Sequence, residues 1–167
     1  MNVETYKLKG WEEAEAGLLI AENDEWVLVK HIPVDYLIDG YRLYRKEFVE
    51  KRIKGNAEKQ IEKVLTLKKV STAKPDWFEF ADTGDILSKI EKQYGLFEFQ
   101  EEEEGDLFYG KINEIDDQFL LIDAIMDDGS IETDEQEYRI DEIRTISFES
   151  DYFQSIRLLY MDENGLL

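Results

Sequence analysis

The sequence predicts a mainly β protein with two helices, an α+β fold in which two related modules follow one another. The main observation is an internal repeat: residues 17–29 (GLLIAENDEWVLV) align without a gap on residues 110–122 (GKINEIDDQFLLI). Short segments rich in β-branched and aromatic residues alternate with polar turns, as in β structure. A repeat period of about ninety residues is too long for a solenoid and indicates two small β modules. The content of 43% hydrophobic and 13% aromatic residues is ample for their cores.

The first half reads as short strands followed by a helix. We expect strands at residues 5–8, 18–21, 26–32, 41–44 and 48–53. The polar sequence Glu-Asn-Asp-Glu at residues 22–25 separates the second strand from the third and predicts a hairpin turn. A helix then begins with Asn56 as its N-cap, because apolar residues follow at helical spacing. Residues 71–76, which include a proline, have the composition of a connector.

The second half begins with a helix and continues as a second set of strands. Asp82 or Thr83 caps this helix, and Gly95 suits its C-terminal end. The strands that we expect cover residues 96–100, 107–115, 119–126, 138–148 and 153–160. The sequence Asp-Asp-Gly-Ser at residues 127–130 is a strong turn signal between two of them.

Once two residues are inserted in the second copy, the repeat extends to Arg45-Lys46-Glu47-Phe48, which then matches Ile140-Asp141-Glu142-Ile143. The order of helix, strand, long hairpin, turn and closing strands in the second half resembles the Sm-like version of the small β-barrel. Together with Asp39-Gly40-Tyr41 and the helix from Asn56, it makes most of the chain similar to uncharacterised bacterial proteins with tandem Sm-like, or SH3-like, domains. The resemblance implies a first small β-barrel with a trailing helix at residues 1–72 and a second with a leading helix at residues 73–167.

Charge is distributed unevenly along the chain. The net charge is −20, but residues 98–151 contain 20 acidic against three basic residues, whereas residues 42–74 contain 11 basic against four acidic ones. An acidic surface of this strength repels phosphate backbones and attracts cationic partners. Four of the eight lysines in the basic stretch lie on the predicted helix, where alternating charges are typical of a solvated face. No loop has the glycine-bearing signature with which Sm proteins contact RNA. We therefore expect a basic protein partner rather than nucleic acid.

Residues needed for several kinds of chemistry are missing. His31 is the only histidine and there is no cysteine, so one chain cannot form a zinc site or a Cys–His catalytic pair. We expect His31 to be structural or at the surface. Neither a glycine-rich phosphate-binding motif nor a Gly-x-Ser-x-Gly element is present. The acidic segment 123–137 fails the EF-hand pattern, because Ala124 and Met126 occupy ligand positions. We expect no enzymatic activity, no metal and no cofactor.

The sequence also bears on where the protein works. The N-terminus has no basic segment followed by an apolar stretch, and no apolar run approaches the roughly 18 residues of a membrane span. We therefore expect neither a signal peptide nor a membrane contact. The absence of cysteine suits the reducing cytosol, and we expect a cytoplasmic protein.

These observations favour a non-catalytic protein-interaction module that uses an acidic surface. One concrete form is an immunity or inhibitor protein that occupies the basic cleft of a nuclease by mimicking the charge of nucleic acid. The alternative is an Sm-like RNA-binding protein that uses the basic stretch at residues 42–74. The residues that we expect to contact a basic partner are Glu101, Glu102, Glu103, Glu104, Asp127, Asp128, Glu132, Asp134, Glu135 and Glu137.

Overall fold

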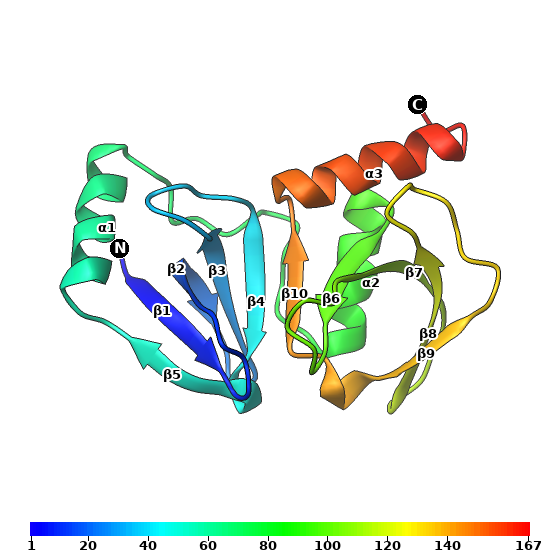
Figure 1. Ribbon diagram of the computed structural model, residues 1–167, viewed down its shortest axis with the longest axis horizontal. Coiled ribbons are helices and arrows are strands. Elements are labelled where there is room, and N and C mark those ends of the chain that lie inside the picture. The colour runs from blue at the N-terminus through cyan, green and yellow to red at the C-terminus, as the bar shows by residue number, and fades with distance from the viewer. The chain divides into compact units, whose positions relative to one another are not determined.

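The computed structural model describes residues 1–167, and its elements are labelled in Figure 1. The fold is mainly β with helices, which confirms the predicted α+β class. The chain forms two compact units, Met1–Asp76 and Trp77–Leu167. The predicted division after residue 72 falls in the connection between α1 (Asn56–Leu67) and α2 (Thr83–Tyr94), which contains no helix or strand. None of the helices is long and apolar enough to cross a membrane.

The first unit is a five-stranded antiparallel sheet followed by α1. Its strands are β1 (Val3–Leu8), β2 (Ala14–Glu22), β3 (Trp26–Ile32), β4 (Tyr41–Arg45) and β5 (Val49–Ile53). They are hydrogen-bonded in the order β5-β1-β2-β3-β4. The short 3₁₀ turn η1 (Lys46–Phe48) connects β4 to β5. Leu65 of α1 is fully buried against Val3, Leu18 and Ile32 of the sheet.

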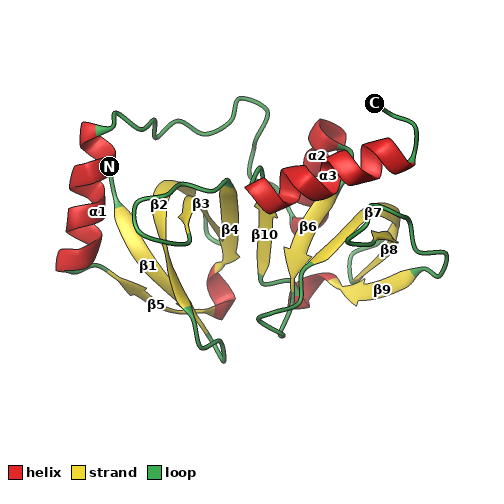
Figure 2. Ribbon diagram, turned by 45° about the horizontal axis from the view of Figure 1, so that its top comes forward, coloured by secondary structure: helices red, strands yellow, loops and turns green.

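The second unit repeats this arrangement between two helices. Its elements are α2, β6 (Phe97–Gln100), β7 (Phe108–Ile115), β8 (Phe119–Ile125), β9 (Gln136–Arg139), the 3₁₀ turn η2 (Ile140–Glu142), β10 (Thr145–Phe148) and α3 (Asp151–Glu163). The strands are antiparallel in the order β10-β6-β7-β8-β9. Figure 2 shows both short 3₁₀ turns in red, each shortly before the last strand of its unit. Each unit therefore has the same order of strands and the same helical turn.

The central hairpins of the two units also share one register. Gly17 pairs with His31 in the first hairpin, and Gly110 pairs with Ala124 in the second. Three residues later the register shifts at the same place in both hairpins, which is the mark of a β-bulge. The segments aligned by sequence thus have equivalent backbone pairing.

A side-chain hydrogen bond shapes the tight turn of each hairpin. The amide oxygen of Asn23 accepts from the backbone N–H of Trp26 at 2.8 Å. The carboxylate of Asp116 accepts from the backbone N–H of Phe119 at the same distance. Asn and Asp side chains favour turns because they can satisfy backbone N–H groups two or three residues ahead. The polar residues between the paired strands therefore determine where each chain reverses.

Two equivalent glycines let the strands of each hairpin approach closely. A Cβ atom on Gly17 would lie 2.7 Å from Cγ2 of Val29, and one on Gly110 would lie 2.8 Å from Cδ1 of Ile122. These distances are shorter than normal carbon contacts, so any larger residue would displace the facing side chain. The repeat keeps glycine where the facing strand carries a buried β-branched residue.

The expected count of two helices was wrong, because residues 153–160 form part of the helix α3 rather than a strand. The hydroxyl of Ser150 accepts from the backbone N–H of Phe153 at 3.0 Å and caps this helix. Phe153, Ile156 and Tyr160 share its buried face. The aromatic and apolar content of residues 153–160 suggested a strand, whereas the cap and the helical spacing of the buried residues determine the structure.

Three smaller predictions were also wrong. The N-cap of α1 is Gly55 rather than Asn56, and the Glu58 carboxylate accepts from its backbone N–H at 2.8 Å. The predicted strand at 138–148 is interrupted by η2. The alignment of residues 45–48 on residues 140–143 was wrong by one residue. Arg45 pairs with Trp26 in the first unit, and its equivalent Arg139 pairs with Phe119 in the second. The second copy therefore has one inserted residue rather than two.

Gly17→Ala tests the close approach in the first hairpin. We expect a loss of about 1–3 kcal/mol in the free energy of unfolding, the usual range for overpacking a filled interior. Gly105→Ala is the matched control, because a Cβ atom there meets nothing within 4 Å, and it should change stability by less than about 0.5 kcal/mol. Urea denaturation of both variants measures the difference. Equal stability of the two would contradict the packing described for Gly17.

Candidate partner-binding surface

The net charge of the chain belongs entirely to the second unit. Met1–Asp76 contains 14 acidic and 14 basic residues, whereas Trp77–Leu167 contains 26 acidic and six basic ones. The first unit is therefore formally neutral, and the second carries the whole charge of −20. Two units with one strand topology thus differ sharply in their electrostatic field.

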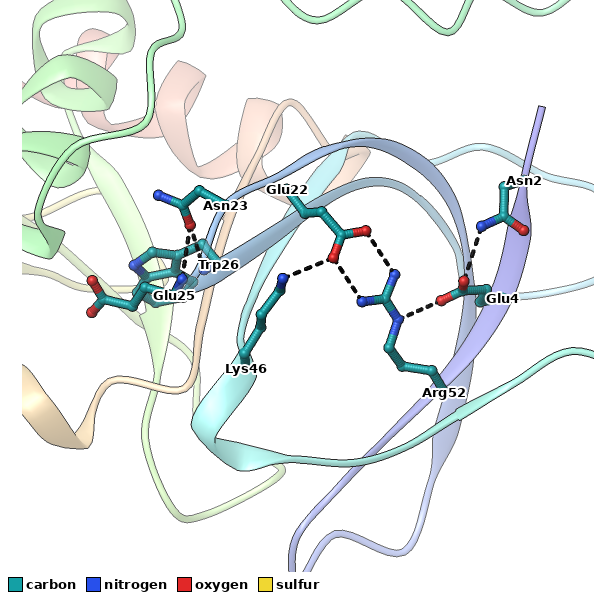
Figure 3. Close-up of polar contacts among 8 residues, drawn as sticks. All are labelled: Asn2, Glu4, Glu22, Asn23, Glu25, Trp26, Lys46 and Arg52. Carbon is teal, nitrogen blue, oxygen red and sulfur yellow. Dashed lines mark hydrogen bonds and ion pairs between the residues drawn. The ribbon is translucent and has the colours of Figure 1, made fainter.

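Cations of the first unit are held by its own carboxylates (Figure 3). The Arg52 guanidinium donates to both carboxylate oxygens of Glu22 at 2.9 and 3.0 Å and to Glu4 at 2.6 Å. Lys46 lies 2.8 Å from the same Glu22 carboxylate. Hydrogen bonds from Arg52 and Lys46 lower the pKa of Glu22 to about 2. This network neutralises two of the cations in the basic stretch.

Further cations of the basic stretch are also paired. The Arg45 guanidinium contacts the Glu25 carboxylate and lies 4.6 Å from the ring centre of Trp26. Lys54 contacts the Glu62 carboxylate. The basic sequence at residues 42–74 therefore does not form a surface of uncompensated positive charge at these positions.

His31 is a buried member of a polar cluster in the first unit. Its Nε2 atom contacts the Glu15 carboxylate, and the Arg42 guanidinium lies 3.7 Å from that carboxylate. Burial lowers the pKa of His31, although its hydrogen bond to Glu15 acts in the opposite direction. Burial also raises the pKa of Glu15, but the His31 hydrogen bond and the Arg42 charge outweigh it, so that the pKa is lowered.

The predicted partner-binding acids lie in two loops and one strand of the second unit. Glu101–Glu104 follow β6, and the others lie between β8 and β9 or on β9 itself. Burial and the charge of Glu142 raise the pKa of Glu101. The Asp128 carboxylate accepts from the backbone N–H and hydroxyl of Ser130 at 2.9 and 2.6 Å, and so organises its own turn.

An apolar groove of about 400 Å³ lies beside the second of these loops. We call it the β7–α3 groove. The residues that line it come from β7, β8, β9, α3 and the adjoining loops, and they are Leu107, Phe108, Tyr109, Ile122, Ala124, Ile125, Met126, Asp127, Glu132, Gln136, Tyr138, Tyr152 and Ile156. Four of them are aromatic, and the only charged ones are acidic.

Aromatic contacts form the walls of the groove. The rings of Phe108 and Tyr138 are 5.0 Å apart, and those of Tyr109 and Tyr152 are 6.0 Å apart. The Tyr109 hydroxyl donates to the buried carboxylate of Glu98, which fixes the orientation of the ring. Tyr152 is 49% exposed, so much of its surface faces solvent.

The turn after β8 closes on α3. Gly129 has a φ of +88°, and a Cβ atom there would lie 2.4 Å from the backbone carbon of Leu159. Only glycine combines this backbone conformation with so close an approach. The turn is held internally by a hydrogen bond from the Gly129 N–H to the Met126 carbonyl at 2.9 Å. Contact with α3 therefore sets the position of the loop that carries Asp127 and Glu132.

The groove brings together only part of the predicted acidic set. Asp127 and Glu132 line it. Along β9, Gln136 and Tyr138 line the groove, whereas Glu137 lines a separate hollow beside Phe119. The remaining predicted acids lie outside the groove lining.

Sequence reasoning missed the aromatic and α3 residues of the groove. Tyr152 and Ile156 are one helical turn apart, and the cap at Ser150 was a signal that could have placed them on a helix face. Phe108 and Tyr138 read as ordinary strand residues, and no local pattern predicts that they meet.

A larger hollow of about 620 Å³ lies at the N-terminus of α2. Its charged lining is entirely acidic: Asp82, Asp85, Glu91, Asp116 and Asp117. The Asp82 side chain accepts from the Asp85 backbone N–H at 2.8 Å and so occupies the helix end. No group of three or more Asp, Glu or His side chains in the chain is arranged to hold a metal ion. The β7–α3 groove is the better candidate site for a protein partner, because four aromatic residues line it, whereas none lines the hollow at α2.

Comparison of the chain with protein-family models, with curated proteins and with solved structures finds no match.

Gly129→Ala tests the contact between the turn and α3. The left-handed conformation costs a non-glycine residue about 1–2 kcal/mol, and the clash with the Leu159 backbone adds to it. Gly10→Ala is the matched control, since Gly10 has a φ of +77° but no atom within 4 Å of the added Cβ. Urea denaturation should show the larger loss for Gly129→Ala. Equal losses would mean that the turn is not seated on α3.

The buried His31 predicts a specific dependence of stability on pH. Its folded pKa lies below the ordinary value of 6.5, so the unfolded chain binds the proton more tightly. The free energy of unfolding should therefore fall as pH decreases below about 6.5. Glu15, whose pKa is lowered from 4.5, adds a further loss at lower pH. His31→Gln should remove the first loss in denaturation curves between pH 7 and 4, and it should weaken the second, because the His31 hydrogen bond helps to lower the pKa of Glu15. An unchanged profile would contradict this assignment.

Proposed function

We propose that this chain is a non-catalytic protein-interaction module whose second unit recruits a basic protein through an acidic surface. The observation that supports it is the segregation of charge: one unit is neutral, and the other carries −20. A field of this strength raises the rate of encounter with cationic partners and discriminates against anionic ones. An immunity or inhibitor protein that covers the basic cleft of a nuclease in the cytosol is the most concrete form of this proposal.

We also propose that both units are Sm-like or SH3-like small β-barrels in tandem, divided near residue 72. The support is the shared strand order and the 3₁₀ turn before the last strand in each unit. Small barrels of this kind serve as compact scaffolds for binding surfaces, and a fold alone does not specify the ligand. The acidic charge of the second unit, rather than the fold, therefore carries the functional argument.

RNA binding through residues 42–74 is the alternative. The paired cations Arg45, Lys46, Arg52 and Lys54 weaken it, because each contacts a carboxylate of the same unit. Binding of phosphate backbones depends on cations that can replace counterions. An RNA mobility shift at low salt, lost steeply as salt rises, would favour this alternative.

The proposal is tested by capture from nuclease-treated lysate with three baits. One is the unchanged chain, and the second carries Asp127→Lys, Glu132→Lys, Asp134→Lys and Glu137→Lys. The third, a control with the same net charge, carries Asp24→Lys, Glu47→Lys, Glu50→Lys and Asp76→Lys in the first unit. We expect a stoichiometric basic protein on the first and third baits and at least a tenfold loss on the second, because close charge pairs contribute to affinity by this order.

The affinity of the captured protein for the unchanged chain should also fall as salt rises, since salt screens exposed charges. Equal capture by all three baits, or no capture at all, would contradict the proposal.

A further inference from the structure

We infer that the β7–α3 groove is the anchor site for the partner: it takes a large apolar side chain from a protein segment that carries lysine or arginine beside it. This inference rests on the proposed function and specifies where, and with what chemistry, the acidic unit binds. The groove lies in the second unit and needs no residue of the first.

The groove offers apolar surface that the fold leaves uncovered. Leu107, Met126 and Tyr152 are each between 41% and 49% exposed, and all three line the groove. Large side chains of this kind, gathered around a cavity of about 400 Å³, are typical of sites that bury an apolar group. Binding energy at protein interfaces is concentrated where an aromatic or long side chain fills such a pocket.

The charge of the rim selects the neighbours of that apolar group. Asp127 and Glu132 are the only charged residues of the lining, and Asp134 and Glu135 follow in the same loop. An acidic segment or a phosphate group would meet repulsion there. Phe108 and Tyr138, which line the groove, add to the preference, because aromatic rings attract cations. In a segment with an apolar anchor flanked by cations, the anchor matches the apolar walls of the groove and the cations match its acidic rim.

The site is held in place by the rest of the unit before any partner binds. Gly129 seats the rim loop on the α3 backbone. The Asn113 side-chain amide donates to the carboxylates of Asp123 and Glu135 at 3.0 and 3.2 Å, which ties the loop to β7. Glu98 fixes the ring of Tyr109 beneath the groove. A site that is ordered in advance loses less conformational entropy on binding.

A protein segment fits better than a small cation. Acidic residues continue beyond the groove along the loop, at Asp128, Asp134 and Glu135. A compact ligand inside the groove would leave the negative charges of these carboxylates without a cation, because the hydrogen bonds that Asp128 and Glu135 accept come from the neutral side chains and backbone of Ser130 and Asn113. A partner segment that places one apolar side chain in the groove and has cations on either side of it can contact the groove and these carboxylates together.

The test uses the full chain and three fluorescently labelled nonapeptides, with binding measured by fluorescence polarisation at low and at physiological salt. The first peptide has tryptophan at its centre and lysine elsewhere, the second has alanine at its centre, and the third keeps the tryptophan but replaces lysine by glutamate. We expect the first to bind about tenfold or more tightly than the second, which corresponds to one filled anchor pocket. The third should not bind.

Two substitutions on α3 locate the anchor. Tyr152→Ala removes a groove wall, and Leu158→Ala removes a side chain of similar exposure, 54% against 49%, that does not line the groove. We expect Tyr152→Ala to erase the preference for tryptophan over alanine, whereas Leu158→Ala should leave it unchanged. Because both side chains are half exposed, neither change should prevent folding. Ala124→Phe, which fills the groove from its floor, should have the same effect as Tyr152→Ala.

The outcomes separate the two proposals. Equal binding of the tryptophan and alanine peptides, with no effect of Tyr152→Ala, would overturn the groove assignment and leave recruitment by charge intact. Failure of both lysine peptides to bind at low salt would overturn the acidic-surface proposal as well. Tighter binding of free tryptophan amide or of spermine than of the lysine–tryptophan peptide would show a small-molecule site instead.

Discussion

The aromatic core of the second unit allows 26 acidic side chains to share one small domain. Self-repulsion at high net charge destabilises a compact state, so burial of apolar surface must offset it. Phe97, Phe99 and Phe148 are fully buried there. The ring of Phe99 lies 5.5 Å from Phe108 and 5.1 Å from Tyr138, both in the β7–α3 groove. The groove is therefore a part of the aromatic core that remains uncovered. It lies among the acidic side chains whose mutual repulsion the core offsets.

The two units share a scaffold and differ in what surrounds it. A guanidinium lies over an aromatic ring at the same place in both, Arg45 over Trp26 and Arg139 over Phe119. In the first unit, Arg45, Lys46, Arg52 and Lys54 pair with carboxylates of the same unit. The second unit adds α3 and an acidic loop of residues 126–135 between β8 and β9. The proposed function therefore uses α3 and the acidic loop, two features that the strand scaffold shared by both units does not require.

Local signals made much of the fold predictable. The sequence indicated a cap of α2 at Asp82 or Thr83 and an end at Gly95, and in the structure the cap is Asp82 and the end is Gly95. The helix α3 was mistaken for a strand, because its aromatic and apolar residues were interpreted as β structure and the cap at Ser150 was overlooked. The groove could not be predicted for a different reason. Phe108, Tyr138 and Tyr152 lie on separate elements, and only tertiary packing brings them together. Charge counting found the acidic loop, but not the apolar walls beside it.

The most direct test of the account is a titration of the ¹⁵N-labelled full chain with the lysine–tryptophan nonapeptide, followed by backbone amide chemical shifts. The account predicts changes confined to the second unit and centred on Tyr109, Asp127, Tyr138 and Tyr152, which line the groove. Changes centred instead on the basic stretch of the first unit, or spread evenly over all acidic residues, would contradict it.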